Sequence, residues 1–455
     1  MKMGIAKEKA SLYNKATQTY KEATKMLKNY STQREKTERI TEKTLIIGID
    51  IASRRHYAQA LTWRKVEVTK GLYFYNERQG FEEFLEWVNH AKQKMGASNI
   101  IVAMEPTGHY YFALEEYLEK LGIEVVIVNA RDVNQMGQYY HNHRSKNDPR
   151  DAMLIGYLCS EGRYAVTTRP KEGPYAELRE LTVRREQLVK KQMASINELH
   201  CLFTQLFPEH KQIKESGISE ALLVLFLELQ TLEAIQAAGW EGLYDILKRH
   251  KKYQIGKDKV KQIHALSISS IGIKRKVKAT QTVLTSVIEE YRFYQQQIKA
   301  IDDDIIAQLN EMDVAKRLMA IPGIGPIITA TFLAEVGDIA NFKSAKQILK
   351  LAGYAICTNE SGNHKGTRRT SKMGRKRLKK IIYQASLATI SNNDDINQIY
   401  MYYTQERKEP LKKMKAVIAI GCKLVRIFFS LLKYNHHYDG QKMLSDIKRP
   451  QGQMA

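Results

Sequence analysis

The sequence predicts a mixed α/β domain followed by a longer all-α region. Between residues 44 and 165, short apolar runs alternate with amphipathic segments, as in a mixed sheet covered by helices. Beyond Pro174 the periodicity is almost entirely helical, and two long apolar seams appear within it. A chain of 455 residues is long enough for roughly two to four domains, each with its own core.

The α/β part follows a polar, basic leader, residues 1–43, that has only weak helical periodicity. Three early strands and then alternating helices and strands resemble the ribonuclease-H-like layout, in which helices cover both faces of the sheet. We expect this domain over residues 44–165. Strands are expected at residues 46–50, 58–63, 71–75, 100–105 and 124–128, and helices at residues 81–95 and 110–121.

The helical part, residues 166–312, contains two seams in which apolar residues recur every three or four positions. Two such helices around an irregular middle, residues 209–281, predict an antiparallel coiled coil or a dimerisation arm. An ordinary buried helix pair is the alternative. The first seam contains Leu178, Leu181, Leu188, Leu199, Leu202 and Leu206, and the second contains Leu284, Ile288, Tyr291, Tyr294, Ile298, Ile301, Ile305 and Leu309.

The last part, residues 313–455, begins at a hairpin with glycines at positions 323 and 325 and ends in a helical tail. These glycines make a tight turn, or they expose backbone N–H groups at a helix start, where a phosphate can bind. Downstream, a dense run of cations is uninterrupted by acids, which favours contact with a nucleic-acid backbone over a solvated surface. The residues expected to bind nucleic acid are Gly323, Gly325, Lys365, Arg368, Arg369, Lys372, Arg375, Lys376 and Arg377.

The composition also fits a polyanionic ligand. The 72 Lys and Arg residues exceed the 49 Asp and Glu residues, which gives a formal net charge of +23. No apolar run reaches the roughly 18 residues of a membrane span, and the Lys-rich amino terminus lacks the apolar core of a signal peptide. We therefore expect a cytoplasmic protein without a membrane partner. The four cysteines lie far apart, so they indicate neither a zinc site nor a disulfide framework.

Four acids have the arrangement of a metal site. Pro149 can open a helix that presents Asp148 and Asp151 on one face. Like charges this close repel each other, and a divalent cation such as Mg²⁺ between them removes the repulsion. Asp50 interrupts one apolar run and Glu105 ends another, at the sheet edge where α/β proteins bind ligands. Each acid alone also fits a cap or an exposed strand end, but their joint order predicts one site.

Ser361 lies in a polar, glycine-bearing loop, residues 359–366, that leads into a basic helix. A serine among cations can act as a nucleophile toward phosphate, because positive charge lowers the cost of forming an alkoxide. A serine before glycine is more often a turn residue. Neighbouring hydroxyls are those of Thr358, Thr370 and Ser371.

These motifs, in this order, resemble those of the DEDD-type transposases of bacterial insertion sequences, the IS110 family. The similarity extends from Thr44 to about Thr389. It implies a RuvC-like amino-terminal domain, a coiled coil, and a carboxyl-terminal transposase domain with a catalytic serine. It is carried by the sequences Ile-Gly-Ile-Asp50, Glu105-Pro-Thr-Gly, Lys-Asn-Asp148-Pro-Arg-Asp151-Ala, Ile-Pro-Gly-Ile-Gly-Pro, and Ser361-Gly followed by Ser-Lys-Met-Gly.

The resemblance implies that Asp50, Glu105, Asp148 and Asp151 hold Mg²⁺ or Mn²⁺ and that Ser361 forms a covalent serine–DNA intermediate. The implied partners are donor and target DNA, a noncoding bridge RNA that pairs with both, and further copies of the chain in a dimer or tetramer at the bacterial nucleoid. The same acids could instead activate water in a hydrolytic Holliday-junction endonuclease. A nonenzymatic nucleic-acid scaffold is a third interpretation. Ser361 separates strand exchange from hydrolysis.

Overall fold

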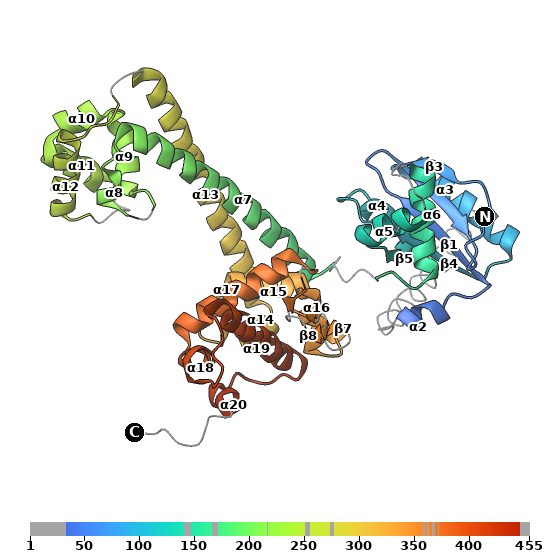
Figure 1. Cartoon of the computed structure of the whole chain (residues 1–455). Coiled ribbons are helices and arrows are strands. Elements are labelled where there is room, and N and C mark those ends of the chain that lie inside the picture. Colours follow the sequence, from blue (N-terminus) through green and yellow to red (C-terminus); the bar gives the residue numbers. More distant parts are fainter. Residues whose placement is uncertain are drawn as a thin grey trace. The chain divides into compact units, whose positions relative to one another are not determined.

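The structure is a computed structural model that describes residues 33–140, 147–165, 172–215, 217–250, 255–273, 277–357, 360–361, 364–365, 369–371 and 373–445. Contacts within the chain divide it into two compact units, Met1–Thr168 and Arg169–Ala455 (Figure 1). Among the described residues, no helix combines the length and the apolarity needed to cross a membrane.

A five-stranded mixed sheet is the centre of the first unit, so the α/β expectation is confirmed. The strand order is β3-β2-β1-β4-β5, in which β1 pairs antiparallel with β2 and parallel with β4. All five strands were expected, although β2 begins earlier than the apolar run that predicted it. The strands are β1 (Thr44–Asp50), β2 (Arg55–Leu61), β3 (Leu72–Tyr75), β4 (Asn99–Met104) and β5 (Glu124–Ile127).

Helices cover both faces of this sheet. On one face, α3 (Arg78–Met95) and α4 (Phe112–Lys120) pack over a core that includes Ile47. On the other face, α6 (Asp148–Ser160) packs over β1 and β2, and its core includes Ile46. Successive residues of a strand point to opposite faces, so the even-numbered positions of β1 face α6. The remaining helices of the unit are α2 (Gln33–Glu38), which belongs to the leader, and α5 (Ala130–Tyr140).

Two long helices, α7 (Pro174–Leu206) and α13 (Val277–Asn310), run side by side in the second unit. Arg185 pairs with Asp302, and Oγ of Ser195 lies 3.5 Å from Oε2 of Glu290, which makes the pair antiparallel. Leu178 and Ile305, from the two predicted seams, are fully buried in one core. The seams therefore pack against each other within a single chain, and self-association along them stays a prediction.

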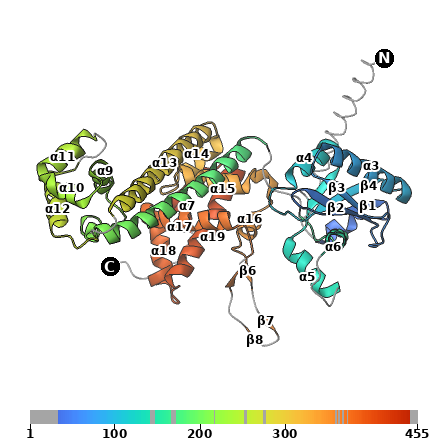
Figure 2. The ribbon, with the colours of Figure 1, turned by 90° about the horizontal axis from the view of Figure 1, so that it is seen from above.

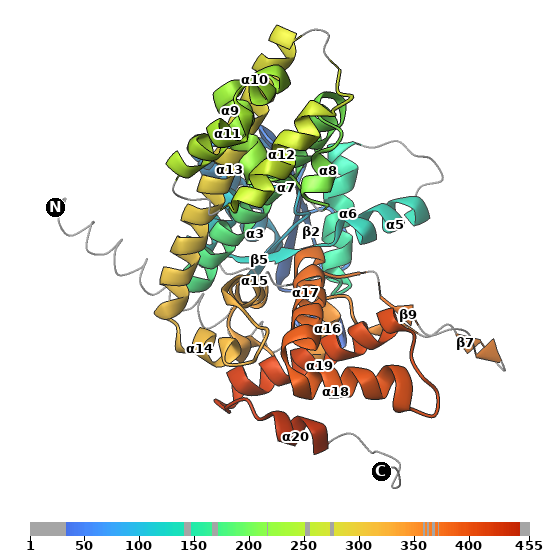
Figure 3. The same ribbon diagram turned by 90° about the vertical axis from the view of Figure 1, so that its left-hand side faces the viewer.

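The prediction of an irregular middle between the seams, residues 209–281, was wrong. Short helices occupy it and gather at one end of the α7–α13 pair (Figures 1 and 3). Residues Ala221 to Phe226 of α9 are buried on every side, so this helix has no amphipathic period that a sequence pattern could reveal. The helices are α8 (His210–Ile213), α9 (Glu220–Leu229), α10 (Leu232–Ala237), α11 (Gly239–Arg249) and α12 (Lys257–Ile268).

A second helical cluster forms the other end of the α7–α13 pair (Figure 3). Between α16 and α17 the chain leaves this cluster in an arm of short strands, with β7 and β8 beyond β6 on the side away from the helices (Figure 2). The helices are α14 (Asp313–Met319), α15 (Pro326–Val336), η1 (Ile339–Asn341), α16 (Ala345–Leu351), α17 (Lys376–Asn392), α18 (Asp394–Met401), η2 (Tyr402–Glu406), α19 (Lys413–Lys433) and α20 (Gly440–Ser445), and the strands are β6 (Ile356–Cys357), β7 (Glu360–Ser361), β8 (His364–Lys365) and β9 (Arg369–Thr370).

Candidate active site

The first two predicted acids lie side by side at adjacent strand ends. β1 and β4 are parallel neighbours, and Ile49 is in register with Met104. Asp50 and Glu105 are the next residues of these strands, and the alternation of side chains directs both toward the face that α6 covers. Both residues are partly buried.

Gly48 allows α6 to approach this face closely. A Cβ atom at this position would lie 2.0 Å from the carbonyl oxygen of Ala152 and 2.7 Å from the backbone nitrogen of Gly156. Contacts that short do not occur, so any larger residue would push the helix away from β1. Asp148 and Asp151, the predicted pair of acids, lie in the first turn of α6, the helix whose close approach depends on Gly48.

The start of α6 matches the sequence pattern. Oδ1 of Asn147 accepts a hydrogen bond from the backbone nitrogen of Arg150 at 3.0 Å, and Pro149 occupies the first turn. Asp148 is exposed and Asp151 is partly buried. The expectation that a helix begins here and carries both acids is confirmed.

Tyr73 connects the helix acids with the strand acids. Its hydroxyl lies near Asp148 and within electrostatic range of Asp50. The pKa of Tyr73 is raised, first by loss of hydration and then by the negative charge of Asp148, while Arg55 opposes the shift. Asp148 and Asp50 therefore both lie within electrostatic range of the Tyr73 hydroxyl.

The backbone places the four acids on the face of the sheet that α6 covers, but their side chains, all among the described residues, do not form a metal-binding cluster. Among the described residues, no three Asp, Glu, His or Cys side chains come close enough to share one ion. Two acids occupy adjacent strand ends, and two occupy the first turn of the helix above them. All four offer carboxylate oxygens, the donors that suit Mg²⁺ or Mn²⁺.

Ser361 lies in the second unit, where its backbone in β7 pairs with His364 in β8. Ser371, the nearby alternative, has a local structural role. Its backbone nitrogen donates to the carbonyl oxygen of Ala355 at 2.6 Å, and its Oγ accepts from the backbone nitrogen of Met373 at 3.1 Å. Thr358, Arg368 and Lys372 lie outside the described residues.

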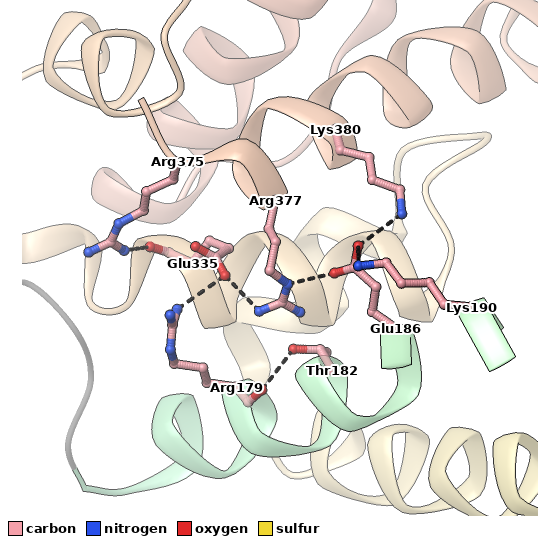
Figure 4. A network of polar contacts seen from close by, with 8 residues as sticks. All are labelled: Arg179, Thr182, Glu186, Lys190, Glu335, Arg375, Arg377 and Lys380. Carbon is pink, nitrogen blue, oxygen red and sulfur yellow. Dashed lines mark hydrogen bonds and ion pairs between the residues drawn. The ribbon is translucent and has the colours of Figure 1, made fainter. Parts of the chain in front are cut away.

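Two of the predicted nucleic-acid ligands belong to an internal network (Figure 4). Arg377 donates to Glu335 and to Glu186, both at 2.8 Å, and Arg375 donates to the carbonyl oxygen of Glu335. Arg179 of α7 donates to the same carboxylate at 3.1 Å. The network holds the start of α17, and so the base of the arm with Ser361, against α7 and α15.

Sequence reasoning missed Glu335 and Glu186, the acids of this network. Lys380 and Arg377 lower the pKa of Glu186 although burial alone would raise it. The available signal was Glu335 itself, a single acid within the apolar sequence of α15. By the argument applied to Asp50, such an acid requires a cation.

The two hairpin glycines have different surroundings. Gly323 has φ of 89°, and an added Cβ would lie 2.7 Å from the carbonyl oxygen of Ala388 in α17, so this glycine is required by packing. An added Cβ on Gly325, which caps α15, would meet no atom within 4 Å. Phosphate binding at the hairpin stays a prediction.

Comparison with known families and proteins assigns the chain to one group. A DEDD transposase family of the IS110 type matches residues 47–208, and the IS116/IS110/IS902 transposase family matches residues 315–401. An uncharacterized 44.8 kDa protein of insertion element IS116 from Streptomyces clavuligerus is 25% identical over 388 residues, which cover 85% of this chain and 94% of the relative.

Two further relatives carry functional names. The transposase of insertion sequence element IS1111A from Coxiella burnetii is 23% identical over 86% of this chain and 91% of its own length. The pilin gene-inverting protein of Moraxella lacunata is 23% identical over 86% of this chain and 97% of its own length. A DEDD transposase domain implies dependence on a divalent metal ion. The chain belongs to the IS116/IS110/IS902 family of transposases, enzymes that cleave DNA strands and rejoin them.

Proposed function

We propose that the chain catalyses DNA strand exchange guided by a noncoding bridge RNA, with a divalent ion held by four carboxylates and a serine nucleophile. The observation that carries this proposal is the placement of Asp50 and Glu105 on adjacent strand ends, below the helix turn with Asp148 and Asp151. The transposase family supplies the class of reaction. Mg²⁺ or Mn²⁺ bound there would neutralise the scissile phosphate and stabilise the leaving oxygen.

Ser361 would act on the same phosphate, from the arm of the same copy or of another copy of the chain. Its Oγ attacks phosphorus, so a serine–phosphate bond forms while one P–O bond of the DNA breaks. The serine proton passes to solvent, and the leaving sugar oxygen takes up a proton. A hydroxyl end of a second strand then attacks the serine–phosphate bond, which rejoins DNA and releases the serine without an external energy source.

Local structure favours Ser361 over Ser371 for this role. The Ser371 hydroxyl accepts a backbone hydrogen bond in the turn before α17, so this group already has a structural role. Ser361 lies in the β7–β8 hairpin, away from the helical cluster (Figure 2). A projecting hairpin can reach a DNA backbone.

Positive charge supports binding of DNA and RNA together. The chain has a formal net charge of +23, which favours association with polyanions. Lys365, Arg368, Arg369, Lys372 and Lys376 would contact phosphates, whereas Arg375 and Arg377 would act mainly through the network of Figure 4. The active form would be a dimer or tetramer, because strand exchange requires several DNA ends to be held at once. It would act at the bacterial nucleoid.

The decisive experiment traps the covalent intermediate. Purified protein with its co-purifying RNA, Mg²⁺ and matching DNA is denatured during the reaction, and the protein–DNA adduct is located by mass spectrometry. We expect the adduct on Ser361, its loss in Ser361→Ala, and its retention in Ser371→Ala, with nucleic-acid binding unchanged in both variants. Free DNA ends without any adduct would instead indicate the hydrolytic endonuclease. Sequencing of the co-purified RNA tests whether a noncoding RNA that can pair with donor and target DNA is bound.

A further inference from the structure

A groove of about 780 Å³ lies in the first unit, beside the first turn of α6 that carries Asp148 and Asp151. Its volume lies within the roughly 300–1,000 Å³ that ligand pockets occupy. Tyr57 and Tyr73, from β2 and β3, form one side, and the first turn of α6 with Asn147 and Arg150 forms the other. We name it the tyrosine groove. The roles assigned above to the four acids and to Ser361 leave it unexplained.

Strand register places the tyrosines of the groove in one row with Asp50 and Glu105. Asp50 is paired with Tyr57 across β1 and β2, and Tyr57 is paired with Tyr73 across β2 and β3. Directly paired residues share a face, so Glu105, Asp50, Tyr57 and Tyr73 form a row across four adjacent strands on the face toward α6. With strands about 4.8 Å apart, Tyr73 lies roughly 10 Å from Asp50 along the sheet.

The two tyrosines form an aromatic platform. Tyr73 is 42% exposed, and the ring of Tyr57 packs edge-on against it with 4.6 Å between centroids. The guanidinium of Arg55 lies over one face of the Tyr73 ring, 4.1 Å from its centroid, and extends the flat surface. Gly71 makes room for Tyr57, because a Cβ on Gly71 would lie 1.9 Å from the Tyr57 hydroxyl. An exposed ring with an adjacent guanidinium is a surface on which any nucleobase can stack.

The other parts of the groove suit a nucleotide. Among the described residues, two cations, Arg150 on the α6 side and Lys70 near Gly71, and one acid, Glu67, line the groove, which leaves it net positive, as contact with a phosphate backbone requires. Arg150 also donates to the carbonyl oxygen of Gly137. Proteins that bind single-stranded nucleic acid combine a positively charged groove with aromatic side chains on which bases stack. The tyrosine groove has the aromatic surface, the volume and the charge for this task.

We propose that the tyrosine groove binds one unstacked base of the DNA strand being cleaved, with the base on Tyr73 and its phosphate directed along the row toward Asp50. The proposal rests on the proposed function only in taking the four acids as the cleavage site. Tyr73 acts as a positioning residue that holds the strand beside the acids. The base contact is independent of sequence, because every nucleobase presents an aromatic face.

The test measures base stacking separately from cleavage. A single-stranded DNA oligonucleotide with one 2-aminopurine is titrated with the full-length protein, and both affinity and fluorescence are recorded. We expect Tyr73→Ala to weaken binding about tenfold and to abolish the fluorescence quenching, as loss of one base–aromatic stack does. Tyr73→Phe, which keeps the ring, is expected to bind within about twofold of the wild type. Tyr139→Ala, at an 86% exposed tyrosine of α5, is the control and should change neither.

Three results would overturn the proposal. Unchanged binding in Tyr73→Ala would show that no base stacks there. Equal losses in the Ala and Phe variants would assign the effect to the hydroxyl and its contact with Asp148. An equal loss on a fully paired duplex of the same sequence would show that Tyr73 contacts the backbone rather than an unstacked base.

Moving the 2-aminopurine along a cleavable substrate then locates the bound base. The strongest quenching is expected at the nucleotide next to the cleavage position, and quenching only far from it would contradict the proposed placement. The Asp148→Asn variant separates the two proposals. If it cleaves DNA normally, the metal site is wrong, while the oligonucleotide titration still decides whether the groove binds a base.

Discussion

Nη1 of Arg377 lies 2.8 Å from Oε1 of Glu335, a carboxylate whose side chain is only 2% exposed. Arg179 approaches the same oxygen at 3.1 Å. Glu335 therefore joins α15 to α7 and to α17, the helix that follows the serine arm (Figure 4).

We expect Glu335→Gln to destabilise the second unit by about 2–4 kcal/mol. Two arginines would lose the charge that balances them, and their partial exposure keeps the cost at or below that of a fully buried pair. The free energy of unfolding is measured by chemical denaturation followed by circular dichroism. Asp313→Asn, which breaks an exposed pair with Lys316, is the control and should cost less than about 1 kcal/mol. Equal effects of the two substitutions would contradict a structural role for the network.

Gly48→Ala is expected to separate α6 from the sheet. The new Cβ would meet the backbone of Ala152 at 2.0 Å, so the helix must move and take Asp148 and Asp151 with it. We expect a loss of about 1–3 kcal/mol in stability and a larger loss of DNA cleavage. The control is Gly137→Ala in α5, where the added Cβ meets Leu154 at an ordinary 3.5 Å. Wild-type cleavage in Gly48→Ala would mean that the close approach of α6 is not needed.

The acids themselves are tested by Asp151→Asn. Loss of one carboxylate from a four-acid site should abolish metal-dependent DNA cleavage while RNA binding stays largely intact, since the protein remains strongly basic. Cleavage and RNA affinity are measured on the same preparation. Glu86→Gln, an exposed acid of α3 on the opposite face of the sheet, should cleave normally. Full activity of Asp151→Asn, or activity in excess chelator, would refute the site.

His56 should make the first unit less stable in mild acid. Its ring is fully buried, and Nδ1 accepts a hydrogen bond from the backbone nitrogen of Ala52 at 3.2 Å. Burial lowers the pKa of His56, with Asn76 opposing the shift.

Because the folded pKa is the lower one, the unfolded chain binds the proton more readily. The stability is fully present above the unfolded value of about 6.5 and is lost as the pH falls below it. We expect His56→Asn, which keeps an acceptor near Nδ1, to show a smaller loss of melting temperature between about pH 8 and pH 5 than the wild type. His90→Asn, at an exposed histidine of α3, should leave the pH dependence unchanged. Identical profiles for the wild type and His56→Asn would exclude His56 as the cause.

The sequence by itself determined the strands of the first unit, the start of α6 and the two long helices of the second. Each rests on a signal within a few neighbouring residues, such as the apolar run that ends at Asp50 or the Asn147 cap before Pro149. These periods and caps follow from the local geometry of strands and helices, so they can be recognised without knowledge of the fold.

Tertiary structure alone decided which distant groups meet. Arg377 pairs with Glu335 and Glu186, and Tyr73 lies near Asp148, although each contact combines elements that are far apart in the chain. The run of cations around Arg377 contains no acid, so the sequence pattern fits an external polyanion as well as it fits acids on other helices of the same chain. Which acid a cation contacts depends on how non-adjacent helices and strands pack, because a charge pair is favourable only at short distance and the spacing of residues in the sequence does not determine that distance.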